Sequence, residues 1–247
     1  MKQYNNSSWA IEELSKVNFG DKRLDKRFLK VASSQALKPA SSINAANNDW
    51  SLVKGAYRFF DNIKVTPEKI LEPHFANTAH RIYGQEFVVV VNDTSFVDFS
   101  SHLMTKGLGT ASAIGDYEVK GVHFHAGLAL SHEGTPLGLV YSKLWSREKQ
   151  TQKGHNHVKV PMKQKESYRW IECLERTKEL LPSGTNALVV GDRESDIYEY
   201  FERAIDLEID VLVRLQHNRV IVDEFGDSER INDFFLNEKV KGKIEVK

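Results

Sequence analysis

The sequence predicts an α/β fold that follows an all-helical region, and two observations support this prediction. From Ser8 to about Gly84, apolar residues recur at spacings of three and four, without the alternation typical of a strand. After Gly84, short β-branched runs alternate with helical patterns, which is typical of a mixed sheet with crossover helices. We therefore expect a layered α/β body behind the helices.

The helical region contains polar residues where its helices are predicted to begin, since such residues cap free backbone N–H groups. These residues are Ser7 or Ser8 before WAIEEL, Asp21 before KRLDKRFLKVASSQAL, Asp49 before WSLVKGAYRFF, and Thr66 before Pro67 and Glu68. The stretch KPASSINAANN, which is rich in Ser, Asn and Ala, is predicted to be a loop.

The helix predicted after Asp21 has a basic surface. Its apolar residues Leu24, Phe28, Val31 and Ala32 share one side, because they are three or four positions apart. The other sides carry the basic residues Lys22, Arg23, Lys26, Arg27 and Lys30.

The body begins with FVVVVND, a β-branched run that predicts a strand buried on both faces. Residues 119–132 and 136–145 predict an antiparallel hairpin. The segment KQKESYRWIECLERTKELL predicts a helix, ALVVGD a second buried strand, SDIYEYFERA a helix capped by Ser195, and IDVLVRL a third strand.

Composition is that of a globular protein. The 247 residues are 40% hydrophobic and 10% aromatic, which excludes a disordered chain, collagen and a coiled coil. The longest apolar run, Phe87 to Val91, is far shorter than the roughly 20 residues of a membrane-spanning helix, and the polar start MKQYNNSS is unlike a signal peptide. We expect a soluble cytoplasmic protein with no membrane partner. The lone Cys173 is predicted to be a packed helical thiol.

The 34 basic and 34 acidic residues balance, but they are unevenly distributed. Residues 1–60 carry ten Lys and Arg against five Asp and Glu, and residues 141–191 again carry ten against five. Residues 61–140 carry five against nine, and residues 192–247 carry nine against fifteen. Basic segments beside acidic ones are compatible with a site that binds both a polyanion and cations, although basic residues on solvated helices give the same pattern.

Two aspartates directly follow buried strands, Asp93 in VVVVNDTS and Asp192 in VVGDRES. Open α/β sheets bind ligands at the carboxyl ends of their strands. If the two strands are parallel neighbours, the carboxylates converge and favour a divalent cation between them, Mg²⁺ or Mn²⁺. The alternative is that each aspartate caps the turn or helix that follows it.

Four motifs resemble those of the cut-and-paste DDE transposases of the insertion-sequence-four family. They are FGDKRLDKRFLKVA at 19–32, GAYRFFDN at 55–62, NDTS at 92–95 and GDRESDIYEYF at 191–201, in the family's order. The resemblance implies a helical domain for transposon-end DNA at 1–84, an incomplete ribonuclease-H-like core at 85–215 and the start of a β-rich insertion at 216–247.

The resemblance also implies roles for individual residues. Asp93 and Asp192 match the family's first two metal-binding catalytic aspartates, with Mg²⁺ or Mn²⁺ as cofactor. The family acts on double-stranded DNA of element terminal repeats, as a homodimer. DNA contacts are expected from Lys22, Arg23, Lys26, Arg27, Lys30, Arg58, Arg193, Arg214 and His217.

The family's third acidic ligand has no counterpart in the sequence. That Glu lies in the pattern Tyr-x₂-Arg-x₃-Glu, and the sequence's Tyr200-x₂-Arg203 is followed by Leu207 at the Glu position. We therefore expect DNA binding without efficient cleavage by a truncated transposase. Two alternatives remain, a DNA-binding regulator of transposition and a stand-alone ribonuclease-H-like nuclease that recruits Asp98, Asp116, Glu118 or Asp196.

Overall fold

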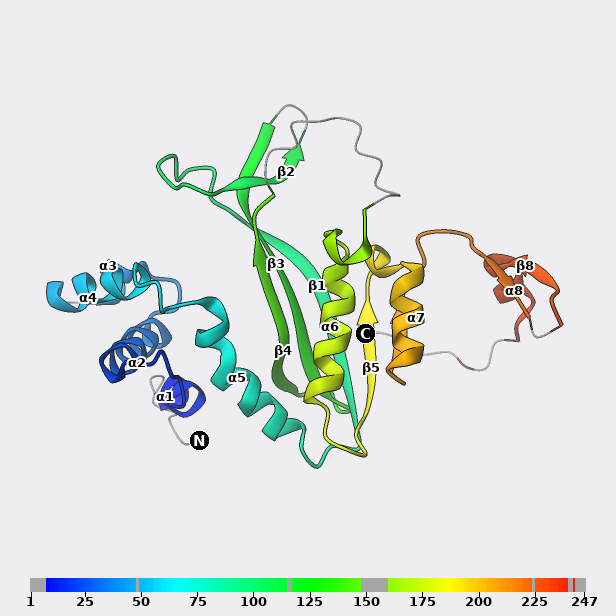
Figure 1. The fold of residues 1–247 in the computed structure, drawn as a ribbon, viewed down its shortest axis with the longest axis horizontal. Helices are drawn as coiled ribbons and strands as arrows, with labels where there is room; N and C mark the ends of the chain where they lie inside the picture. Colours follow the sequence, from blue (N-terminus) through cyan, green and yellow to red (C-terminus); the bar gives the residue numbers. More distant parts are fainter. Residues whose placement is uncertain are drawn as a thin grey trace.

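The computed structural model describes residues 8–47, 49–114, 117–147, 160–223, 225–239 and 242. A group of helices from the first third of the chain lies beside a sheet with helices in front of it, and a small third unit lies at the opposite end (Figure 1). The chain thus has the α/β fold with a mixed sheet and N-terminal helices that the sequence predicts.

The N-terminal helices are α1 (Ser8–Leu14), α2 (Lys22–Leu37), α3 (Ile43–Ala46), α4 (Trp50–Phe60) and α5 (Pro67–Ile82). Asp21, Asp49 and Thr66 cap α2, α4 and α5 as predicted, each accepting a backbone N–H with its side chain. The predicted loop KPASSINAANN was wrong in part, because Ser42 caps the four-residue helix α3 within it.

An aromatic cluster holds these helices together. The rings of Phe19, Phe28 and Phe59 lie 5.3–5.7 Å apart between centroids, from the segment before α2, from α2 and from α4. All three side chains are buried. The apolar side of α2 predicted by its spacing therefore packs on α4.

The sheet is formed by β1 (Phe87–Asp98), β2 (Gly109–Ile114), β3 (Tyr117–Ser131), β4 (Pro136–Trp145), β5 (Asn186–Gly191) and β6 (Asp210–Val213). Its order is β2-β3-β1-β5-β6, and β4 also pairs with β3. β3 and β4 form the predicted antiparallel hairpin. β1, β5 and β6 run parallel, which places their carboxyl ends at one edge of the sheet.

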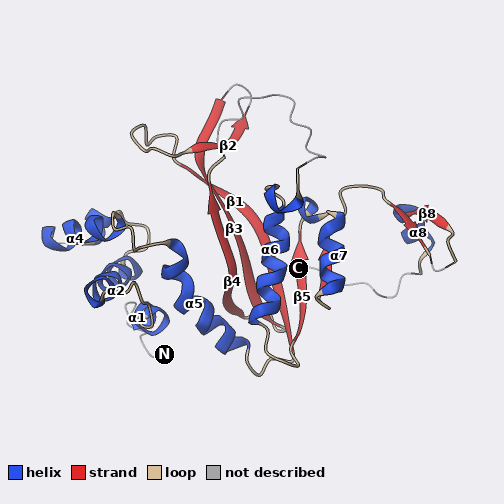
Figure 2. Cartoon of the chain, viewed as in Figure 1, coloured by secondary structure: helices blue, strands red, loops and turns tan. Residues whose placement is uncertain are grey.

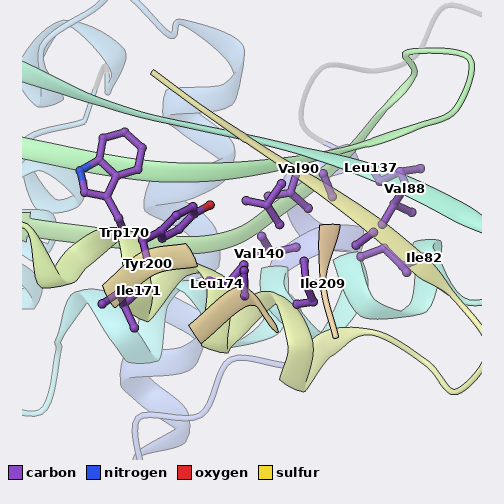
Figure 3. Close-up of a cluster of buried hydrophobic side chains, with 14 residues drawn as sticks. Ile82, Val88, Val90, Leu137, Val140, Trp170, Ile171, Leu174, Tyr200 and Ile209 are labelled. Carbon is purple, nitrogen blue, oxygen red and sulfur yellow. The ribbon is translucent and has the colours of Figure 1, made fainter. Parts of the chain in front are cut away.

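Helices cover one face of this sheet, here called the helix-covered face (Figure 2). α6 (Tyr168–Leu180) and α7 (Tyr198–Asp206) pack on it, and α5 lies against β4. Figure 3 shows the resulting core, a cluster of buried side chains that includes Leu174 of α6, Tyr200 of α7, and Val88 and Val90 of β1. Cys173 is buried there, as predicted for a packed helical thiol, and burial raises its pKa to about 12.

The opposite face, here called the open face, is incompletely covered. Successive strand residues point to opposite faces, so Val91 and Leu212 lie opposite the buried Val90 and the partly buried Val211. Val91 is 41% exposed and Leu212 57% exposed. Within the described residues, therefore, these two apolar side chains are only partly covered.

The third unit follows β6 and contains β7 (Val220–Val222), β8 (Ser228–Arg230) and α8 (Ile231–Asn237). β7 and β8 pair antiparallel, separately from the main sheet. The helix α8 was not predicted for this segment, which we expected to be β-rich. None of the described helices is long and apolar enough to cross a membrane.

Candidate nucleic-acid interface and carboxylate site

The parallel strands bring Asp93 and Asp192 side by side. The last paired residues of β1 and β5 are Val91 and Val190, and the two aspartates follow two residues later. The expectation that the first strand ends at Asp93 was wrong, because β1 continues to Asp98 through its pairing with β3, and only its pairing with β5 ends before Asp93. Gly191 pairs with Val213 of β6, so Arg214 stands beside Asp192 on the next strand. We call Asp93, Asp192 and Arg214 the strand-end row. Adjacent strands lie about 4.8 Å apart, which makes neighbours of these side chains.

The strand-end row lies on the open face. Asn92 and Gly191 are buried toward the helices, so the next residues, Asp93 and Asp192, point the other way. Both aspartates and Arg214 are exposed. Two hydrated carboxylates and a guanidinium are thus presented at the edge where open sheets bind ligands.

Each aspartate accepts one backbone N–H. Oδ1 of Asp93 accepts from Thr94 N at 2.7 Å, and Oδ1 of Asp192 accepts from Glu194 N at 2.8 Å. The second bond caps the 3₁₀ helix η3 (Arg193–Ser195). The alternative in which the aspartate caps the following helix is therefore correct for Oδ1 of Asp192. Oδ2 of both carboxylates is bonded to no residue in the described ranges.

These carboxylates fit a hard divalent cation. Mg²⁺ is commonly bound by one or two carboxylates and completes its shell with water and substrate phosphate oxygens. No group of three His, Cys, Asp or Glu side chains gathers anywhere in the described residues. Two oxygens from the chain, with the rest of the shell from water or DNA, match that mode of binding.

A polar network centred on the buried Arg169 lies beside the strand-end row and includes the exposed side chain of Glu194. Arg169 of α6 donates from Nε to Thr94 Oγ1 at 2.9 Å and pairs with Glu194 through Nη2. Thr94 Oγ1 lies 2.8 Å from Nδ1 of His125. Burial, aided by the charge of Arg169, lowers the pKa of His125 to about 3, so its ring is neutral and Nδ1 accepts the threonine hydroxyl.

A basic groove lies in the N-terminal helices, between α2 and α4. Its volume is about 560 Å³. The side chains of Arg27 and Arg58 line it, together with Gly55. A Cβ atom on Gly55 would lie 2.2 Å from Nη1 of Arg27, so the missing side chain gives that guanidinium room to cross α4. The basic residues that line the groove are Arg23, Arg27, Lys54 and Arg58.

A charged cluster joins these helices to the sheet. Glu13 of α1 binds Arg81 of α5 through both oxygens, at 2.8 and 2.9 Å, and His74 Nδ1 at 2.5 Å. His74 Nε2 accepts the Leu139 N–H of β4 at 2.9 Å, and Arg81 Nε donates to the Leu137 carbonyl. Hydrogen bonds and an ion pair therefore connect the helices α1 and α5 to strand β4 of the sheet.

Residues 6–65 match the family model described as transposase DNA-binding. The matched region covers α1 to α4 and the whole groove between α2 and α4. The chain is thus similar to transposases in a domain that binds DNA, and the groove provides the positive charge that phosphate binding needs.

The structure separates the DNA-binding residues that the sequence predicts. Arg23, Arg27 and Arg58 share the α2–α4 groove, although Arg23 is also paired with Asp21 at 3.2 Å. Lys30 lines a different hollow, between α1, α2 and α4. Lys22 and Lys26 are exposed on α2 outside the groove.

The remaining three predicted contacts lie in the α/β body. Arg193 directly follows Asp192, and Arg214 stands in the strand-end row. The backbone N–H of His217 donates to the carboxylate of Asp196 at 3.1 Å, which fixes this residue close to the same edge. All three side chains are exposed.

One role expected after Asp192 was wrong. Ser195 does not cap α7, because it lies buried in η3 and donates its hydroxyl to the Asp192 carbonyl at 2.7 Å. The next residue, Asp196, is buried and accepts the N–H groups of Gln216 and His217 and the Arg219 side chain. Asp196 therefore anchors the segment after β6.

Three of the further acidic ligands considered for a stand-alone nuclease are described by the structure, and none of them forms a metal-binding group with the strand-end row. Asp98 lies five residues beyond Asp93 on β1, roughly 16 Å away at 3.3 Å per residue. Glu118 hydrogen-bonds Thr110, and Asp196 pairs with Arg219. Asp116 lies outside the described residues.

The basic segment at 146–165 is described only in part, since 148–159 lie outside the described residues. Lys163 and Lys165 line a cavity of about 980 Å³ with Trp145 and Arg169. The Trp145 ring is stacked on His123 at 5.1 Å on one side and lies 5.5 Å from the Arg169 guanidinium. These two neighbours obstruct stacking of the Trp145 ring on a nucleic-acid base.

Sequence reasoning missed Lys54 and Arg169. Lys54 lies among apolar residues in the first half of α4, and its position in the groove depends on α4 packing against α2. Arg169 directly precedes the apolar Trp170, and a charged residue at a helix start is usually exposed. The burial of the charged Arg169 side chain is apparent only from the structure.

Proposed function

We propose that this chain is a transposase-like protein that binds element-end DNA with its N-terminal helices and a divalent cation with Asp93 and Asp192. The coincidence of the basic α2–α4 groove with the transposase DNA-binding match carries the proposal. Lysine and arginine contacts to phosphates provide most of the affinity of such interfaces.

The finer assignment is a DDE transposase of the insertion-sequence-four family with a ribonuclease-H-like core, acting as a homodimer on DNA. It rests on the motifs NDTS and GDRES and is supported by the parallel pairing of the strands that precede them. A bound Mg²⁺ or Mn²⁺ would activate the attacking oxygen and stabilise the leaving oxygen of a phosphodiester. Asp93 and Asp192 would hold it, and Arg193 and Arg214 would orient the DNA backbone.

The groove is tested by comparing Lys54→Ala with Lys30→Ala in gel-shift titrations on duplexes that carry terminal inverted repeats. Lys54 lines the groove and Lys30 does not, although both are lysines of the matched domain. We expect Lys54→Ala to weaken binding and to reduce the salt dependence by about one released counterion. Equal effects of the two substitutions would locate the DNA elsewhere.

Gly55→Ala tests the same groove without removing a charge. The new methyl group would displace the Arg27 guanidinium, while alanine favours a helix over glycine by about 1 kcal/mol. We expect weaker DNA binding in a protein that melts at the same or a higher temperature. Unchanged affinity would show that the Arg27 position is unimportant for binding.

The catalytic part is tested by incubating the chain with end DNA and Mg²⁺ or Mn²⁺. As the sequence predicts, we expect binding without efficient strand cleavage. Cleavage that is lost in Asp93→Asn and Asp192→Asn would instead make this chain an active nuclease and disprove that expectation.

A regulator of transposition is a second candidate, favoured by the position of the groove in helices that contain neither aspartate. DNA binding by α2 and α4 alone would block element ends. Coexpression with a complete transposase should then lower transposition, and Lys54→Ala should relieve the block. Normal transposition despite strong end binding would reject this role.

A further inference from the structure

A buried arginine connects the two strand ends that carry the carboxylates. The Arg169 side chain is 6% exposed, and its guanidinium carbon lies 5.5 Å from the centre of the Trp145 ring and 5.3 Å from that of the Trp170 ring. Its Nη1 donates to the Glu166 carbonyl at 3.0 Å. The two aromatic rings and this bond hold the guanidinium in place.

Arg169 binds one residue shortly after each of the two aspartates. Nε donates to the side chain of Thr94, and Nη2 donates to the side chain of Glu194. The backbone N–H groups of these same residues donate to Oδ1 of Asp93 and Oδ1 of Asp192. The side chains that the guanidinium holds therefore follow Asp93 by one residue and Asp192 by two.

The chemistry of the contacts suits arginine. The planar guanidinium donates from Nε and Nη2 in fixed directions, whereas a lysine ammonium is a single point on a flexible stem. Thr94 is further fixed because its hydroxyl accepts from Arg169 and donates to Nδ1 of the neutral His125. The backbone beside Asp93 consequently has little freedom to move.

We propose that Arg169 is a positioning residue that fixes the relative orientation of the Asp93 and Asp192 carboxylates. The effect of Arg169 on cation binding rests on the proposed cation site, whereas its effect on the two carboxylates does not. Orientation of the two carboxylates sets where their Oδ2 atoms lie, and a divalent cation is bound tightly only when its oxygen ligands are correctly placed.

The direct test measures amide hydrogen exchange of Thr94 and Glu194 in wild-type protein and in Arg169→Lys and Thr94→Val. We expect exchange of both amides to accelerate in Arg169→Lys by about tenfold, the effect of losing one hydrogen bond. In Thr94→Val, amide exchange at position 94 should accelerate, and exchange of the Glu194 amide should stay nearly unchanged. The Val189 amide, in the middle of β5, reports general destabilisation.

Arg176→Lys is the matched control. Arg176 lies on the same helix, is 40% exposed, pairs with Glu179 and lies 5.7 Å from the Phe75 ring. This substitution should leave the Thr94 and Glu194 amides unaffected. Unchanged exchange of both amides in a folded Arg169→Lys protein overturns the inference.

The functional test measures Mn²⁺ affinity by electron paramagnetic resonance, with Asp93→Asn and Asp192→Asn as references for loss of the site. Faster exchange together with about tenfold weaker Mn²⁺ binding in Arg169→Lys supports the inference. Faster exchange with unchanged Mn²⁺ affinity overturns it. If wild-type protein binds no Mn²⁺ through the aspartates, the proposed cation site fails, and the two amides alone decide whether Arg169 positions the strand ends.

Discussion

The two faces of the sheet are built from similar apolar residues and have different surroundings. Val90 of β1 is completely buried under the helices, whereas its neighbour Val91 on the open face is 41% exposed. On β5, Val189 is completely buried and Asp192 further along points to the open face. The helix-covered face provides stability, and the open face presents the strand-end row to water.

The difference shows how a charged site is placed on an apolar strand. Two carboxylates on the helix-covered face would lose their hydration, at a cost of several kcal/mol each. On the open face they remain hydrated, and their positions are fixed from behind by Thr94, Glu194 and Arg169. Rigidity and hydration are thus supplied from opposite sides of one sheet.

The largest expected effect compares the same substitution on the two faces. Leu174 of α6 is completely buried against the sheet, while Leu212 of β6 is 57% exposed on the open face. We expect Leu174→Ala to lower the free energy of unfolding by about 2–5 kcal/mol, because it removes packed atoms and leaves a cavity. Leu212→Ala should cost less than about 1 kcal/mol.

Urea denaturation followed by circular dichroism measures both values. Equal losses for Leu174→Ala and Leu212→Ala would break the comparison, since Leu212 would then be as well packed as the core. A loss for Leu212→Ala that grows with protein concentration would show a second copy covering the open face.

Much of this arrangement follows from local sequence patterns. The caps Asp21, Asp49 and Thr66 are side chains that bond backbone groups two or three residues away, so a short window of sequence suffices to predict them. Asp93 and Asp192 are predictable as neighbours because β-branched runs mark parallel strands and each aspartate follows such a run.

The rest depends on contacts between distant segments. Asp196 binds residues about twenty positions away, and Arg169 binds Thr94 seventy-five positions away. Neither partner is indicated by spacing. The sequence does not indicate which face is open either, because the valines of β1 point to both faces of the sheet. Burial of alternating valines is decided by helices elsewhere in the chain.

A second effect concerns pH and the helix-covered face. His125 is neutral in the folded protein, since burial lowers its pKa to about 3, while in the unfolded chain it titrates near 6.5. Unfolding therefore takes up a proton between these values. As the pH falls from about 6.5 toward 3, the free energy of unfolding should decrease by up to about 1.4 kcal/mol per pH unit from this residue.

The His125 contribution is isolated by comparing wild-type protein with His125→Asn, whose amide oxygen keeps an acceptor for the Thr94 hydroxyl. Denaturation midpoints across this pH range should converge as the pH falls. His132→Asn, on the exposed turn between β3 and β4, is the control and should parallel wild type. Parallel profiles for His125→Asn would mean that His125 is accessible to protons in the folded state.

The smallest expected effect on stability belongs to the strand-end row. Asn replaces Asp at a helix N-cap at little cost, so Asp192→Asn should retain the bond from Glu194 N and remove the repulsion from Asp93. We expect the free energy of unfolding to change by less than about 0.5 kcal/mol. Mn²⁺ binding should be lost in the same protein. Stability that falls by several kcal/mol on this substitution would assign Asp192 to the framework of the sheet, and the open face would then lose its distinction as the face that carries the site.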